Sequence, residues 1–146
     1  DTHAVNPTLY PDLPFNTARD LAPVMLIATA PNCIVTNVGK PVCFIIELEN
    51  GFRIWHMGDT GVFGDMKWIS EYYKPDLVLI PIGGYFTMDP VDAAYALREP
   101  IKPKFAIPMH YGTNAFNQGT PQELIKALGS APVKVIALKP GEKAEF

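Results

Sequence analysis

The sequence predicts an α/β protein in which helices cover a sheet, and three observations carry this prediction. From residue 42 onward, apolar β-type runs alternate with segments of helical period. Gly, Pro, Asp and Thr lie at the ends of these segments, where turns and helix caps need them. The resulting order is hairpin, α, β, α, β, α, β, which is typical of a layered α/β fold. The 146 residues fit one domain, large enough to bury a core without disulfides or a structural metal.

The sheet is expected from five β-rich runs. The first two are joined by the short turn 49–51 and should form a hairpin. If Leu48 pairs with Phe52 across this hairpin, Cys43 lies opposite Met57. The expected strands are 42–48, 52–56, 76–81, 104–110 and 133–138.

Three helices are expected between these strands. The segment 63–74 repeats its apolar residues at helical spacing and so has one apolar face. A second helix should begin at Pro90, with Asp89 as its N-cap. The third is opened by "TPQE", a capping box with proline at the first helical position, and is closed by Gly129. The apolar face of the first helix consists of Phe63, Met66, Ile69 and Tyr73.

Residues 1–41 are less regular, because they hold six of the 15 prolines and show no sustained period. Only 24–30 and 33–37 look like strands there. Two cysteines, Cys33 and Cys43, have no CxxC spacing and are expected to be reduced thiols in the core.

Charge and hydropathy exclude several classes of protein. Twelve Lys and Arg are scattered among 15 Asp and Glu, giving a formal net charge of −3, so no nucleic-acid partner is expected. The longest apolar stretch, "LAPVMLIATAP", is interrupted by Pro23 and is too short to span a bilayer. No signal-peptide pattern precedes it. We therefore expect a cytoplasmic protein without membrane attachment.

Chemistry in such folds gathers in loops beyond the carboxyl ends of the strands. Three loops occupy that position: "MGDTG", "IGGYFTMD" and "HYGTN". They should converge on one rim, where Asp59 and His110 face each other and Tyr85, after Gly83 and Gly84, lies between them. Asp59 is then a metal ligand, a general base, or only the cap of the next helix. His110 alone could be a structural hydrogen-bonder, and His56 should pack or bond across the sheet.

Residues 38–146 resemble the second half of a metallo-β-lactamase-fold metal-dependent hydrolase, in the branch near ascorbate-6-phosphate lactonases. The motifs are "FRIWHMGDTGVFGDM", "YKPDLVLIPIGGYFTMDP", "DAAYALREPIKPKFAIPMHYGT" and "GTPQELIKALG". The resemblance implies half of an αββα sandwich, in which Asp59 bridges two metal ions and His110 binds one. The metal would be zinc or another divalent ion. The family commonly carries a histidine where this chain has Tyr85.

The chain departs from that family upstream, because the His-x-His-x-Asp-His motif is absent. Its three histidines are His3, His56 and His110. A catalytic zinc needs three protein ligands, and the motifs supply two, Asp59 and His110. A third would have to come from Tyr85, Cys43, His56 or His3, so metal binding by one chain should be weak or absent. Residues 1–37 instead resemble a fragment of the solute receptors of tripartite tricarboxylate transporters. We expect them to form a grafted segment that covers apolar surface.

Two functional interpretations follow. In the first, the protein is a metal-dependent hydrolase of an ester, lactone or phosphoester, a small-molecule substrate. Asp59 and His110 hold the ion, Thr60 supports Asp59, and Tyr85 stabilises developing charge or donates to the leaving oxygen. In the second, it is a catalytically inactive half-domain that folds by homodimerisation through its apolar sheet. Acid and base catalysis by Asp59 and His110 without metal is a smaller third possibility.

Overall fold

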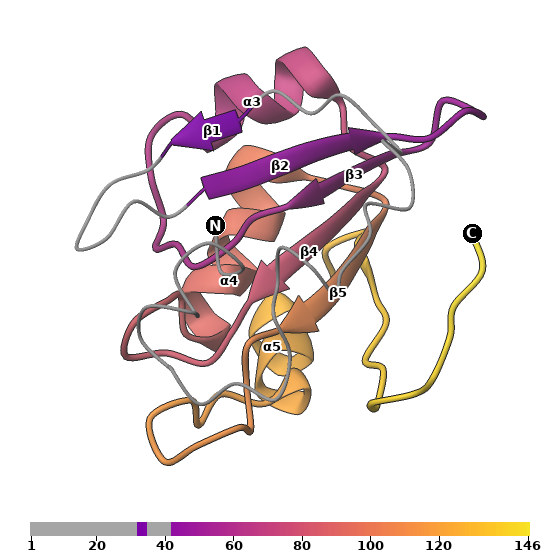
Figure 1. Ribbon diagram of the computed structural model, residues 1–146. Coiled ribbons are helices and arrows are strands. Elements are labelled where there is room, and N and C mark those ends of the chain that lie inside the picture. Colours follow the sequence, from indigo (N-terminus) through magenta and orange to yellow (C-terminus); the bar gives the residue numbers. More distant parts are fainter. Residues whose placement is uncertain (1–31, 35–41) are drawn as a thin grey trace, which may run out of the picture.

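The computed structural model describes residues 32–34 and 42–146 of the chain. They form a six-stranded sheet in the order β1-β2-β3-β4-β5-β6, with helices between the later strands (Figure 1). None of the helices in this part of the chain is long and apolar enough to cross a membrane. The strands are β1 (Asn32–Ile34), β2 (Val42–Glu47), β3 (Arg53–His56), β4 (Leu77–Pro81), β5 (Phe105–Met109) and β6 (Lys134–Val135). The helices are α3 (Met66–Tyr73), α4 (Pro90–Ala96), the π-helical turn η1 (Leu97–Ile101) and α5 (Pro121–Leu128).

The sheet is mixed. β1, β2 and β3 pair antiparallel, and β3, β4, β5 and β6 pair parallel. The hairpin register is the expected one: Phe44 pairs with His56, and the Leu48 amide donates to the Phe52 carbonyl at 2.9 Å. The parallel pairing brings the carboxyl ends of β3, β4 and β5 to one rim of the sheet, which confirms the α/β architecture.

One face of the sheet carries the hydrophobic core, and α4 and α5 lie behind that face in Figure 1. Alternate strand residues, among them Ile45, Trp55 and Ile80, are buried against the helices. The expected apolar face of α3 is confirmed for Met66 and Ile69, which are buried, and for Tyr73, which packs partly buried beside them. Phe63 also packs on the core, but it precedes the helix, which begins at Met66 and not at residue 63 as expected. Cys43 is also in this core as a free thiol, whereas the side chain of Cys33 lies outside the described residues.

The helix ends follow the sequence signals. The Asp89 Oδ1 accepts hydrogen bonds from the amides of Val91 and Asp92, each at 2.8 Å. The capping box that opens α5 is complete, because the Thr120 hydroxyl accepts from the Glu123 amide and the Glu123 carboxylate accepts from the Thr120 amide. Both caps therefore confirm the expected helix starts.

Three expectations need correction or fall outside the described residues. The second helix does not end as a plain α-helix. It continues into η1, which contains Pro100, a residue without an amide hydrogen for the α-helical bond. The last strand is two residues long rather than six. The predicted strand 24–30 and the packing of the segment 1–37 fall outside the described residues, apart from β1.

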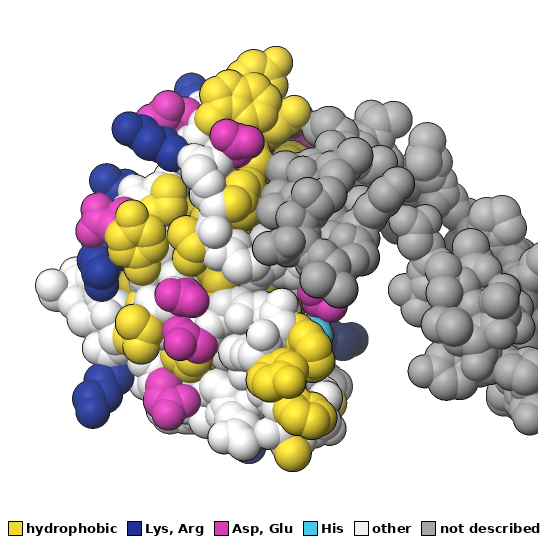
Figure 2. All heavy atoms as spheres, turned by 90° about the vertical axis from the view of Figure 1, so that its left-hand side faces the viewer, with side chains coloured by type: hydrophobic (Ala, Val, Ile, Leu, Met, Phe, Trp, Pro, Cys, Tyr) yellow, Lys and Arg dark blue, Asp and Glu magenta, His cyan; other side chains and the backbone are white. Residues whose placement is uncertain are grey.

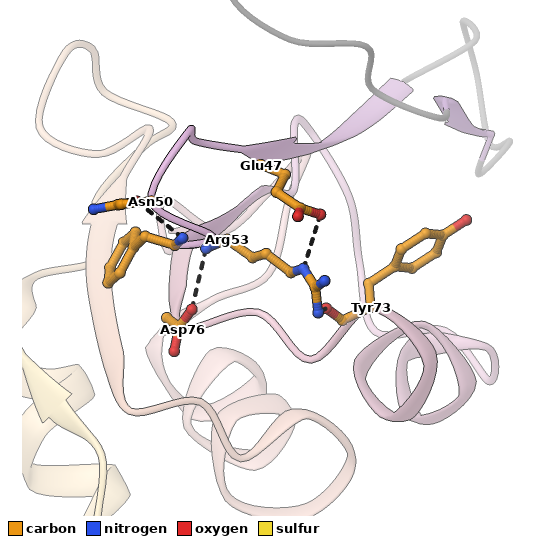
Figure 3. Close-up of polar contacts among 6 residues, drawn as sticks. Glu47, Asn50, Arg53, Tyr73 and Asp76 are labelled. Carbon is orange, nitrogen blue, oxygen red and sulfur yellow. Dashed lines mark hydrogen bonds and ion pairs between the residues drawn. The ribbon is translucent and has the colours of Figure 1, made fainter.

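Asp76 links β3, β4 and β5 at the end of the sheet opposite their carboxyl ends. Its carboxylate accepts from the Arg53 amide at 3.1 Å and from the Lys104 ammonium at 2.8 Å (Figure 3 shows the first of these). Arg53 in turn donates from its guanidinium to Glu47 and to the Tyr73 carbonyl. The hydrogen bond from Lys104, followed by that from the Arg53 amide, lowers the pKa of Asp76 below its usual value.

We expect Asp76→Asn to lower the free energy of unfolding at pH 7 by about 1 kcal/mol, because the amide bonds Arg53 and Lys104 less strongly. A carboxyl with a lowered pKa stabilises the fold above its unfolded value near 3.8 and loses this contribution as the pH falls through the folded value. Urea unfolding at pH 7 and pH 3 measures the effect. The difference between wild type and variant should shrink at pH 3, and an unchanged difference would contradict this account.

Candidate functional site

Three loops at the carboxyl ends of β3, β4 and β5 form the candidate site, and backbone hydrogen bonds tie them together. The Met88 amide donates to the Thr60 carbonyl at 3.0 Å, joining the loop after β4 to the loop after β3. The Gly119 amide donates to the Gly83 carbonyl at 3.3 Å, joining the loop after β5 to the loop after β4. The three loops therefore form one continuous rim.

Asp59 and His110 face each other across this rim, as the sequence predicted. The Nε2 atom of His110 lies 3.5 Å from the Oδ1 atom of Asp59. The Asp59 side chain is 62% exposed and that of His110 is 30% exposed, so a small molecule or ion can reach both. The Nδ1 atom of His110 is buried and has no hydrogen-bond partner among the residues that the structure describes. The pair thus joins an accessible carboxylate to an imidazole with unused bonding capacity.

The turn that presents Asp59 is stabilised locally. The Gly58 amide donates to the Nδ1 atom of His56 at 3.2 Å, so the His56 side chain bonds within its own turn, whereas it was expected to pack or bond across the sheet. Thr60 is buried, and its hydroxyl donates to the Gly61 carbonyl at 2.9 Å. The expected support of Asp59 by this hydroxyl is therefore not present. Asp59 also does not cap α3, whose N-cap is Asp65.

His110 and Tyr85 share an unusual backbone conformation, with φ of 56° and 57°. Among the described non-glycine residues, the two others with positive φ, Lys74 and Lys102, end helices, where this conformation is common. At His110 and Tyr85 no helix end accounts for it. Strain of this kind, about 1 kcal/mol or more for each residue, is found most often at functional sites.

The backbone of Gly83 closely approaches the backbone carbonyl of His110. A Cβ atom at Gly83 would lie 2.2 Å from the His110 carbonyl oxygen and 3.0 Å from the Asn117 side chain. Only glycine allows the two loops to approach this closely. The position of His110 therefore depends on the absence of a side chain at residue 83.

Tyr85 is on the rim but is not joined to the Asp59–His110 pair by a hydrogen bond. Its ring packs on Phe86, with centroids 4.5 Å apart, and on Phe116, at 5.0 Å. All three side chains are exposed. Sequence reasoning missed Phe86 and Phe116, and the signal available for them was aromatic residues in both rim loops.

The donors present suit part of a divalent-metal site. A carboxylate and an imidazole are ordinary zinc ligands. A metal-binding histidine normally donates its other ring N–H to a partner that orients the ring, and within residues 43–146 the buried Nδ1 atom of His110 has none. Within residues 43–146, however, no group of three or more His, Cys, Asp or Glu side chains is placed to hold an ion. Cys43 is buried in the core, and His56 bonds the Gly58 amide. A complete site therefore needs donors from outside these residues.

The fold and this rim define one sheet and one helical layer of the metallo-β-lactamase architecture. A family model described as a β-lactamase superfamily domain matches residues 25–110, more than half of the chain. The chain belongs to this superfamily.

Relatives and solved structures agree with this assignment. A "UPF0173 metal-dependent hydrolase" of Polaromonas sp. is 69% identical over 108 residues, which are 74% of this chain and 40% of that protein. One of the same description from Korarchaeum cryptofilum is 52% identical over 113 residues, covering 76% of this chain and 50% of that protein. The chain thus spans about half or less of the length of these relatives. The solved structure of Igni18, a novel metallo hydrolase from Ignicoccus hospitalis, is 34% identical with a TM-score of 0.68, covering 80% of this chain and 54% of that one.

Proposed function

We propose that this chain carries the Asp59 and His110 side of a metal-dependent hydrolase centre that acts on an ester, lactone or phosphoester. The observation that carries the proposal is the 3.5 Å approach of these two side chains on an accessible rim. The description of the relatives as metal-dependent hydrolases supports it. The cytoplasmic location expected from the sequence stays a prediction.

The chain's own residues have separate roles in this proposal. Asp59, held by the turn that the Gly58 amide and His56 stabilise, offers a carboxylate as a metal donor. His110 offers an imidazole as the second donor, fixed by its backbone contact with Gly83. A divalent ion, when bound, lowers the pKa of a coordinated water to about 7 and polarises the substrate oxygen. Tyr85 lies in the loop between Gly83 and Met88, the two residues whose backbone hydrogen bonds join this loop to its neighbours. Its phenol can donate to a leaving oxygen.

Metal analysis together with hydrolysis assays tests the proposal. The full chain is purified, loaded with Zn²⁺ or Mn²⁺, and assayed on a γ-lactone, a 4-nitrophenyl ester and a 4-nitrophenyl phosphate with and without chelator. We expect metal-dependent turnover of at least one substrate, removed by the chelator and restored by metal. Turnover that the chelator leaves intact would favour metal-free acid and base catalysis. No turnover by metal-loaded protein would favour the inactive half-domain.

We also propose that the chain forms a homodimer through the sheet face that points away from the helices. Most side chains there are apolar and partly buried or exposed, with His56 among them, whereas a sheet face in solvent normally carries polar residues. A second copy related by a two-fold axis offers a self-complementary cover, and donors from two chains could complete one metal site. The apolar residues on this face include Phe44, Ile46, Ile54, Leu79 and Ile107.

Light scattering at micromolar concentration is expected to give about twice the 16.1 kDa mass of one chain. Ile46→Lys should shift the mass toward that of a monomer, because it places a charge in the proposed interface. Lys67→Glu on the exposed surface of α3 is the matched control and should leave the mass unchanged. A strictly monomeric wild type at high concentration would rule the dimer out.

A further inference from the structure

Three exposed aromatic side chains form a wall on the rim, and the roles above account only for the phenol group of Tyr85. Tyr85, Phe86 and Phe116 are 75%, 67% and 55% exposed, and their rings contact one another across the two loops. Figure 2 shows hydrophobic side chains gathered low on the molecule, beside a histidine. Large apolar side chains grouped on a surface are costly to solubility and commonly mark a binding site.

An open pocket on the same rim adjoins this wall. Its volume is about 670 Å³, within the range of roughly 300–1,000 Å³ that small-molecule sites occupy. Tyr85 and Phe116 form its aromatic side, and Gly83 also lines it. Gly83 closely approaches the backbone carbonyl of His110, so the pocket shares with the Asp59–His110 pair the loop that positions His110, although neither side chain of the pair lines it.

The charges around the pocket disfavour an anionic ligand. The residues that line it include Asp89 and Glu123 but no Lys or Arg, and the loops 57–65, 82–89 and 110–120 contain none either. The amino ends of α4 and α5 could attract an anion, but their amides are already bonded. At α4 the amides of Val91 and Asp92 donate to the Asp89 carboxylate. At α5 the Glu123 amide donates to the Thr120 hydroxyl, and the Thr120 amide donates to the Glu123 carboxylate. Proteins that bind phosphate groups usually supply Arg, Lys or free helix amides.

We propose that this pocket binds the aryl or alkyl part of a neutral ester or lactone and that the site discriminates against phosphoesters. The inference rests on the proposed hydrolase function and narrows its substrate class. The aromatic wall supplies the apolar contact, and the acidic lining repels a phosphate dianion. Tyr85 and Phe116 are then specificity-determining residues.

A titration of the full, metal-loaded chain tests the proposal with two ligands that share a phenyl group, γ-phenyl-γ-butyrolactone and phenyl phosphate. Calorimetry should show the lactone binding at least about tenfold more tightly. Phe116→Ser should weaken lactone binding about tenfold, since aromatic residues dominate binding energy at such contacts. Tyr85→Gly is a second variant, which removes the other ring that lines the pocket. It keeps the backbone conformation at residue 85, because glycine adopts a positive φ freely.

The matched control is Trp68→Ser, which removes an exposed aromatic residue on α3, away from the pocket. It should leave lactone binding unchanged. Equal or tighter binding of phenyl phosphate, an absence of lactone binding, or the same loss in the Trp68 variant would overturn the inference. Lactone binding without hydrolysis of any substrate would count against the proposed function alone, while preferential hydrolysis of phenyl phosphate would keep that function and reject this substrate class.

Discussion

Replacing Gly83 by alanine is expected to lower the free energy of unfolding by roughly 2–3 kcal/mol and to abolish metal binding at the rim. The added methyl group would lie 2.2 Å from the His110 carbonyl oxygen, which is backbone and cannot rotate away. The loop after β5 must then shift, and His110 moves away from Asp59. Urea unfolding and calorimetric titration with Zn²⁺ measure the two effects.

Gly64→Ala is the matched control, because this residue is also on a rim loop but has nothing within 4 Å of an added Cβ and no positive φ. Its unfolding free energy should stay within about 0.5 kcal/mol of wild type. If Gly83→Ala behaves like Gly64→Ala in both measurements, the close contact between the two loops does not position His110.

The second large effect is expected from removal of either donor of the pair. Asp59→Asn and His110→Gly should each weaken binding of Zn²⁺ by about 100-fold or more, since each removes or neutralises a direct ligand from an already small set. Neither should lower stability much, because the Asp59 side chain is exposed and glycine relieves the positive φ at His110. Calorimetric titration and thermal unfolding separate the two effects.

Asp65→Asn controls for the loss of one negative charge on the same loop. Asp65 is the N-cap residue of α3, but its side chain makes no capping hydrogen bond, so its replacement should change neither metal affinity nor stability beyond measurement error. Metal binding that survives in both Asp59→Asn and His110→Gly would place the ion elsewhere and remove the basis of the proposed centre.

The Asp59–His110 pair could be predicted from sequence because it depends on topology. Parallel strands end at a common rim, so a residue following each strand is brought to that rim whatever the packing details. The caps at Asp89 and Thr120 were also predictable, since the residues that bond lie within three positions of one another.

The remaining features depend on which nearby partner a side chain takes or on contacts between loops, and the sequence pattern determines neither. The Thr60 hydroxyl bonds the Gly61 carbonyl, and His56 accepts from the amide of its neighbour Gly58. The aromatic wall requires the loop of Tyr85 to meet that of Phe116. Tyr85 has its positive φ within a tight turn, in which the amides of Phe86 and Thr87 donate to the Gly84 carbonyl. η1 forms at Pro100, where the usual α-helical bond has no donor.

The change from antiparallel to parallel pairing at β3 has a consequence for the order in which the molecule folds. The β2–β3 hairpin joins neighbouring residues and can close in about 1–10 μs. Asp59 and His110 are 51 residues apart in the chain and meet only after two parallel pairings have formed, each across an intervening helix. Pairing over such separations is slow, because loop closure costs entropy before contacts form. During synthesis the β2–β3 hairpin should therefore form early and the rim with Asp59 and His110 late. A chain that ends before residue 110 would have a partial sheet but no assembled site.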